Sequence, residues 1–135
     1  MRYRVVAFGG SRMKSAALRA ACDDYLSRLK HYAKIEERDA LPKEESRFVA
    51  LDRTGEAWTS EQLAELTARW ELEGRDVTFA IGDADGLPDD VSKRAERRWS
   101  LGPLTLPHEL ARVIVYEQLY RAYTIRRGEK YHRGS

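Results

Sequence analysis

Short apolar runs alternate with amphipathic stretches along this chain, and this alternation restricts the possible folds more than any other feature. Residues 3–8 and 76–81 are short and rich in β-branched and aromatic residues, which predicts strands. Residues 15–32 repeat apolar side chains every three or four positions, which predicts a helix. Strands that alternate with helices predict an α/β fold with a mainly parallel sheet and helices on both faces.

The remaining elements follow from the same patterns and from residues typical of helix ends. Thr59 and Gln62 have the spacing of a capping box, Gly74 fits the position after a helix, and Pro107 fits a first helical position. Further strands are expected at residues 35–38, 47–51 and 98–101, and further helices at residues 60–72, 88–96 and 107–125. We expect one domain over residues 1–135, because no linker or repeat interrupts the pattern.

Composition excludes several classes of protein. Charged residues make up 34% and hydrophobic residues 42% of the chain, as in ordinary globular proteins. No apolar run approaches the roughly 20 residues that cross a membrane, so no membrane partner is expected. A single cysteine, Cys22, excludes an internal disulfide and fits a reducing compartment, which predicts a cytoplasmic protein.

Basic residues gather in two blocks. Residues 120–135 hold five basic residues against one acidic residue, and residues 93–98 hold four against one. Such blocks favour a polyanionic partner such as RNA. The alternative, that they are a solvated surface and a frayed tail, stays open at this point.

Three loops rich in glycine, proline and aspartate follow three predicted strands. They span residues 52–55, which include an expected turn at Thr54 and Gly55, residues 82–86, and residues 102–107. Ligands of parallel sheets bind outside the carboxyl ends of the strands, so the loops are expected to share one pocket. The alternative is that these residues only make turns. No phosphate-binding glycine motif is present, and the calcium-like aspartates of the second loop lack the other ligands, so no metal is expected.

The last third of the chain places special chemistry at both ends of one helix. The loop at residues 102–107 leads into the helix N-terminus, where backbone N–H groups are available to a ligand. Tyr131, His132 and Arg133 offer stacking, proton transfer and phosphate contacts. Glu117 and Arg121 are four residues apart, which predicts an ion pair that fixes Arg121, or else an ordinary surface pair.

The segment WSLGPLTLPHELARVIVYEQLYRAYTI at residues 99–125, followed by YHR at residues 131–133, resembles the C-terminal signature of the RlmH family. The likeness continues upstream through GRDVTFAIG at residues 74–82 and covers most of the chain from Phe48 onward. The family consists of SPOUT-class methyltransferases that use S-adenosylmethionine. The resemblance implies methylation of a pseudouridine ring nitrogen, N3, in 23S ribosomal RNA, within the large subunit or the assembled ribosome. It also implies a C-terminal trefoil knot and a homodimer.

The resemblance also assigns roles to particular residues. It implies that the cofactor is bound by Leu51, Gly82, Asp83, Gly102, Pro103, Leu104, Thr105, Leu106 and Pro107. It implies that His132, Arg121 and Tyr131 are catalytic, with His132 accepting a proton, and that Arg133, Lys130 and Arg126 contact RNA. The tail is expected to reach the active site of the partner subunit.

Two features depart from the family pattern. Asp83 stands where members usually carry a second glycine, and it would be strained if the backbone there needed a positive φ. A short polar connector lies between Ile35 and Phe48, where members carry a basic stretch and another helix, so this is a shortened member. The alternative function is therefore an RNA- or ribosome-binding protein of SPOUT fold whose cofactor site is impaired. An unrelated flavodoxin-like nucleotide binder would require the likeness of the tail to be accidental.

Overall fold

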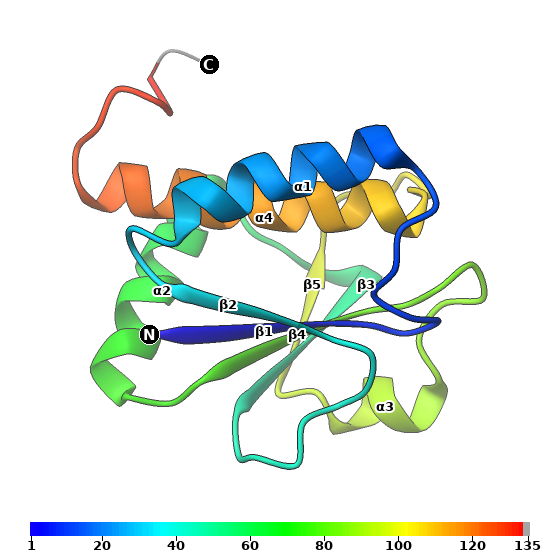
Figure 1. The fold of residues 1–135 in the computed structure, drawn as a ribbon. Coiled ribbons are helices and arrows are strands. Elements are labelled where there is room, and N and C mark those ends of the chain that lie inside the picture. The colour runs from blue at the N-terminus through cyan, green and yellow to red at the C-terminus, as the bar shows by residue number, and fades with distance from the viewer. Residues whose placement is uncertain (134–135) are drawn as a thin grey trace.

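All strands in residues 1–133, the part of the chain that the structure describes, join one parallel sheet in this computed structural model (Figure 1). The strand order is β2-β1-β4-β3-β5, and each neighbouring pair is parallel. The strands are β1 (Arg2–Ala7), β2 (Lys34–Arg38), β3 (Arg47–Ala57), β4 (Val77–Ile81) and β5 (Arg97–Ser100). The predicted parallel α/β architecture is confirmed.

The helices begin and end largely where their capping residues predict. They are α1 (Ala16–Leu29), α2 (Ser60–Glu73), α3 (Asp89–Arg94) and α4 (His108–Arg126). At the start of α2, Thr59 Oγ1 accepts from the Gln62 backbone N–H at 3.0 Å, and Gln62 Oε1 accepts from the Thr59 N–H at 2.8 Å. Gly74 ends α2 with a φ of 71°, which is the left-handed conformation that glycine adopts without strain. The capping box and the glycine cap are therefore confirmed.

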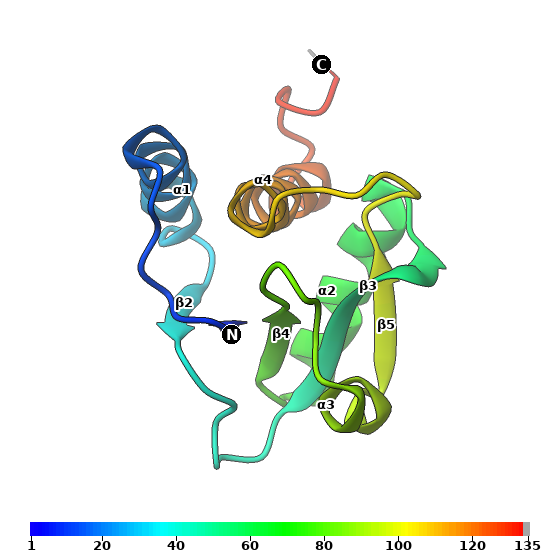
Figure 2. The same cartoon turned by 90° about the vertical axis from the view of Figure 1, so that its right-hand side faces the viewer.

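Helices cover both faces of the sheet, but unequally. Helix α4 packs against α1 on one side and α2 on the other, so these three helices share one face (Figure 2). Their core with the sheet includes Tyr3, Phe79, Trp70 and Trp99. The short helix α3 lies on the opposite face: its Ser92 accepts a hydrogen bond from Arg98, whose strand neighbour Trp99 points into the core.

Several predicted boundaries are wrong. Helix α1 ends at Leu29 rather than at Tyr32. Strand β3 does not end at Leu51 but continues to Ala57, with a shift of register against β5 between Leu51 and Glu56. No turn ends the strand at Thr54 and Gly55, although Asp52 Oδ1 accepts from the backbone N–H of Thr54 at 2.9 Å in this irregular stretch. The chain nevertheless resumes pairing with β5. Helix α4 begins one residue after Pro107, and α3 ends at Arg94 rather than near residue 96. The trefoil knot stays a prediction.

A carboxylate ties α4 to β2 and α1. Glu37 accepts hydrogen bonds from Arg112 and, at 2.6 Å, from the Tyr116 hydroxyl, both on α4. It also forms an ion pair with Arg19 of α1 at 3.2 Å. The Arg112 side chain is only 3% exposed, so Glu37 neutralises a charge that solvent scarcely reaches. Although partial burial opposes ionisation, the hydrogen bonds from Tyr116 and Arg112 hold the pKa of Glu37 below its usual range.

Replacing Glu37 with glutamine should therefore destabilise the fold. The amide cannot neutralise buried Arg112, so we expect Glu37→Gln to lower the free energy of unfolding by about 1–3 kcal/mol at neutral pH. Urea unfolding measures this loss. Glu45→Gln is the matched control, because Glu45 is exposed and makes no ion pair within residues 1–133.

The difference in stability between the wild type and Glu37→Gln should depend on pH. The lowered pKa means that the ionised Glu37 stabilises the fold above the ordinary carboxyl pKa of about 4.3, and that this contribution is lost as pH falls through the lowered value. The stability difference between wild type and Glu37→Gln should therefore shrink on acidification. A difference that stays constant across this range contradicts the role given to Glu37.

Candidate functional site

The three predicted loops meet around one pocket of about 780 Å³ at the carboxyl edge of the sheet. Of the residues expected to bind a cofactor, all line it except Pro103. The lining ones are Leu51, Gly82, Asp83, Gly102, Leu104, Thr105, Leu106 and Pro107. The structure thus confirms that the loops share a pocket, while the cofactor role of these residues stays a prediction. The first residues of α4 close one side of the pocket through His108 and Ala111.

The loop after β4 is a tight turn that depends on glycine. A Cβ atom at Gly82 would lie 2.4 Å from the carbonyl carbon of Gly86, which is closer than real contacts. The Gly86 N–H donates to the Asp83 carbonyl at 2.9 Å, and the Asp85 N–H donates to Asp83 Oδ1 at 2.9 Å. The carboxylate of Asp83 therefore stabilises the turn itself.

Asp83 does not have a strained backbone conformation. Within residues 1–133 every residue with a positive φ is a glycine, so Asp83 has an ordinary backbone conformation. The condition for strain at Asp83, a positive φ, is not met, because the turn takes its positive φ at Gly86 instead, at 81°.

The loop after β5 is held against β3 by polar contacts. Ser100 Oγ accepts from the Gly102 N–H at 3.0 Å and donates to the Arg53 carbonyl at 2.9 Å. The Arg53 guanidinium reaches across to Thr105 Oγ1 at 2.9 Å. Leu104 is 74% exposed beside this contact, which leaves an apolar side chain at the mouth of the pocket. Arg53 is not among the predicted site residues, and the only feature of the sequence that points to it is its place in the loop after Leu51.

A second cluster of predicted residues forms at the other end of α4. The Arg121 guanidinium donates to Glu117 Oε2 through Nε at 3.1 Å and Nη2 at 2.9 Å. Arg121 Nη1 lies 2.9 Å from His132 Nδ1, and Arg121 Cζ lies 4.9 Å from the centre of the Tyr131 ring. The Tyr131 hydroxyl donates to Glu117 Oε2 at 2.7 Å. The three residues expected to be catalytic thus lie together, and the predicted pair of Glu117 and Arg121 is confirmed.

The tail cluster extends to two helices that the sequence does not link to it. The Tyr131 and Tyr25 hydroxyls lie 3.4 Å apart, and Tyr131 packs edge-on against Tyr120. His132 Nε2 lies 3.5 Å from Glu61 Oε2 of α2. Burial and the hydrogen bonds to Tyr25 and Glu117 raise the pKa of Tyr131 above its ordinary value, so its phenol stays protonated and available as a donor.

The three residues expected to contact RNA differ in their surroundings. Arg126 forms an ion pair with Glu71 of α2 at 2.8 Å and lies over the Tyr123 ring, so it joins two helices of the fold. Lys130 and Arg133 are exposed. All three residues are exposed, and among them only Arg126 forms an ion pair within residues 1–133.

The pocket and the tail cluster of one chain lie far apart. His108 borders the pocket and Arg121 anchors the tail, and thirteen helical steps between them correspond to roughly 20 Å along α4. One chain therefore does not bring the two groups of predicted site residues together.

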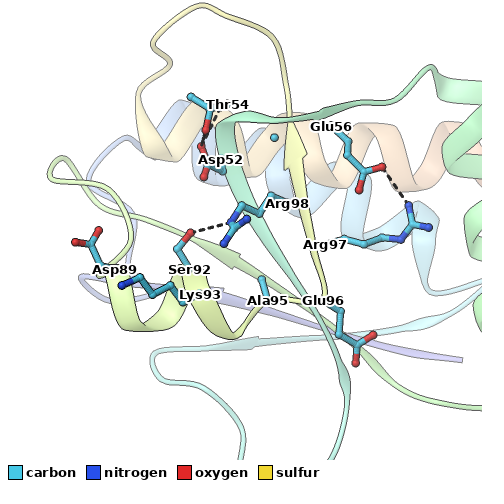
Figure 3. Close-up of a pocket in the computed structure, with 11 residues that line it drawn as sticks. Asp52, Thr54, Glu56, Asp89, Ser92, Lys93, Ala95, Glu96, Arg97 and Arg98 are labelled. Carbon is cyan, nitrogen blue, oxygen red and sulfur yellow. Dashed lines mark hydrogen bonds and ion pairs between the residues drawn. The ribbon is translucent and has the colours of Figure 1, made fainter.

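A second depression, of about 700 Å³, lies between α3 and the strands β3 and β5 (Figure 3). Its lining is strongly charged, and its cations are mostly bound by neighbours: Arg97 contacts Glu56 at 3.4 Å, and Arg98 donates to Ser92 at 3.3 Å. Asp52 borders both this depression and the first pocket. The mixed charge gives this depression no clear preference for one kind of ligand.

Comparison with known proteins assigns the family. Residues 36–132 match the family described as Predicted SPOUT methyltransferase. A protein of Sorangium cellulosum (strain So ce56) is 45% identical over 97% of this chain and 99% of its own length, and is named Ribosomal RNA large subunit methyltransferase H. A protein of Anaeromyxobacter sp. (strain Fw109-5) with the same name is 42% identical over 98% of this chain and 100% of its own length. This chain belongs to the SPOUT methyltransferases, in the group of these relatives.

The alignment with the Anaeromyxobacter methyltransferase runs over 157 positions, more than the 135 residues of this chain. The relative therefore carries residues that this SPOUT methyltransferase lacks, in agreement with a shortened member. A solved structure titled as a probable methylase family protein from Haemophilus influenzae Rd KW20 shares the fold, with a TM-score of 0.65 at 12% identity over 96% of this chain and 69% of that chain.

The contacts of Glu117 predict how the tail of this methyltransferase is held. Glu117→Ala removes the acceptor for Tyr131 and Arg121, so residues 129–133 should detach more often from α4. We expect trypsin to cut after Lys130 about three- to tenfold faster under native conditions, as followed by mass spectrometry. Glu65→Ala, on an exposed position of α2, is the control. Equal cleavage of the two variants contradicts the anchoring role.

Proposed function

We propose that this SPOUT methyltransferase transfers a methyl group from S-adenosylmethionine to ribosomal RNA of the large subunit, at ring nitrogen N3 of a pseudouridine. The observation that carries the proposal is end-to-end similarity to two proteins named Ribosomal RNA large subunit methyltransferase H, at 45% and 42% identity. The pocket at the carboxyl edge and the basic, aromatic tail supply the two surfaces that such a reaction needs.

The residues of the pocket fit S-adenosylmethionine. Leu51, Leu104 and Leu106 give apolar surface for an adenine ring, and the backbone of the glycine loops can approach its polar edge. The carboxylates of Asp52 and Asp85 also border the pocket, and they suit a ligand that carries a sulfonium and an ammonium group. The volume of about 780 Å³ lies in the range of small-molecule sites.

The protein contributes to the proposed reaction mainly by orienting the methyl donor and the nucleobase. When bound, S-adenosylmethionine supplies an electrophilic methyl group on a positively charged sulfur. On transfer to the ring nitrogen, its sulfur would keep the electron pair and become neutral, and the proton of the ring nitrogen would pass to water. The pocket residues would hold the donor and orient it toward the ring nitrogen. Tyr131 can stack on a base, while Lys130 and Arg133 can contact phosphates.

The separation of pocket and tail supports a homodimer in which the tail of each subunit serves the pocket of its partner. About 20 Å of helix between the two groups favours a contact to one nucleobase that is shared between two subunits. In residues 1–133, no helix combines the length and apolarity needed to pass through a bilayer. We place the reaction in the cytoplasm, where ribosomal RNA is found.

Methyl transfer to RNA tests the proposal directly. The purified protein is incubated with S-adenosylmethionine and, separately, with free 23S RNA, isolated large subunits or assembled ribosomes, and digested RNA is analysed by mass spectrometry. We expect one methylated pseudouridine. The incubation that gives the most product identifies the preferred substrate among free RNA, large subunits and assembled ribosomes. Retained binding of RNA, with neither binding of S-adenosylmethionine nor a methylated product, favours instead the alternative of a binding protein whose cofactor site is impaired.

The contacts of Asp83 argue against that alternative, and they make a prediction of their own. Because its carboxylate stabilises the loop rather than straining it, Asp83→Gly should not tighten binding of S-adenosylmethionine by more than about threefold in isothermal titration. Asp83→Asn keeps the acceptor oxygen and should bind about as well as wild type. Tightening of tenfold or more in Asp83→Gly means that the carboxylate obstructs the site.

A further inference from the structure

His132 lies between two groups of opposite hydrogen-bonding character. Its Nδ1 is 2.9 Å from Arg121 Nη1, and its Nε2 is 3.5 Å from Glu61 Oε2. The side chain is about one-third exposed, so its Nε2 edge remains open to an incoming group. The two contacts together determine which nitrogen carries the proton.

The guanidinium fixes the first nitrogen. Arginine has five N–H donors, no acceptor, and does not lose its proton in proteins. A hydrogen bond between Arg121 and His132 therefore requires the lone pair of Nδ1. The neutral imidazole has a single N–H, which must then be on Nε2. The Glu61 carboxylate is an acceptor on that side, which agrees with this assignment.

Arg121 is itself held in place. Glu117 accepts from two of its nitrogens and leaves Nη1 directed at His132, while the Tyr131 ring lies against the guanidinium. The side chains of Arg121 and Glu117 are 14% and 17% exposed. Solvent therefore competes little for these contacts, and the order Glu117, Arg121, His132 forms a chain from the helix to the tail.

We propose that Arg121, oriented by Glu117, fixes His132 as its Nε2–H tautomer, so that His132 offers the nucleobase a hydrogen-bond donor rather than a proton acceptor. The part that concerns the nucleobase rests on the proposed function. Glu117 and Arg121 are positioning residues in this account. The expectation from the sequence, that His132 accepts the proton of the ring nitrogen, is replaced by a different role for the same residue.

The chemistry of the proposed target suits a donor. The ring nitrogen N3 lies between two carbonyl groups, so negative charge spreads onto their oxygens when its proton passes to water. A donor placed at one of these oxygens stabilises that charge before the methyl group arrives. His132 Nε2–H can supply this hydrogen bond without changing its own protonation state.

Two replacements of His132 separate a donor from a base. Glutamine carries an amide N–H that can replace Nε2–H but cannot take up a proton, whereas leucine offers neither. With saturating S-adenosylmethionine and RNA, His132→Gln should keep its single-turnover rate within about tenfold of wild type, while His132→Leu loses about 10²–10³-fold. If His132 is a general base, both variants lose activity equally, by about 10²–10⁴-fold.

The tautomer is tested without any reaction. In the full chain with ¹⁵N-labelled histidine, at a pH well above the ordinary imidazole pKa of about 6.5, the His132 resonances should show a proton on Nε2 alone. The His132→Gln variant identifies these signals. In Arg121→Met a second tautomer should appear for His132, with His31 and His108 unchanged as internal controls. A protonated Nδ1, or a mixture in the wild type, overturns the proposal.

Two variants of Glu117 test whether this residue positions Arg121. Glu117→Gln keeps an oxygen that can accept from Arg121, whereas Glu117→Leu does not, so the tautomer mixture should be larger in the leucine variant. These spectra do not depend on methyl transfer. A fixed tautomer with no methylation of any RNA leaves the assignment of His132 intact and rejects the proposed function alone.

Discussion

The burial of α4 between α1 and α2 is the constraint on which the rest of the structure depends. Val115, Leu119 and Ala122 are fully buried along this helix. Polar contacts fix it at both flanks, through Glu37 on the side of α1 and through Glu71 on α2, which accepts from the Tyr123 hydroxyl at 2.6 Å. The start of α4 closes the pocket and its end carries the tail cluster, so one helix sets the positions of both candidate regions.

Much of the fold could be predicted, because its signals are local. Helix ends such as Thr59 and Gly74 depend on hydrogen bonds within a few residues. The continuation of β3 past residues 52–55 could not be predicted in this way. Asp52 and Thr54 do form a local hydrogen bond, but pairing with β5, more than forty residues further along the chain, decides that the strand continues past them.

The candidate site also combines features that could be predicted from the sequence with contacts between distant residues that could not. The shared pocket follows from parallel strands, whose carboxyl ends must lie at one edge of the sheet. The contacts of Tyr25 and Glu61 with the tail had no sequence signal, because they join residues 106 and 71 positions apart. Arg126 shows what a basic block does not reveal: its place in the block indicates RNA, and in the fold its charge is also paired with Glu71. A block of like charges does not reveal which members are paired within the fold.

In the proposed homodimer, the pocket of one subunit and the tail of the other act on the same nucleobase. The most direct test mixes two inactive variants: Gly82→Val, which blocks the pocket loop, and a chain that ends after Gly128, which lacks the tail. Co-expression with different tags yields mixed dimers with one intact pocket facing one intact tail. We predict that purified mixed dimers regain methyl transfer to the large subunit. Mixed dimers that form but remain as inactive as their parents contradict the account.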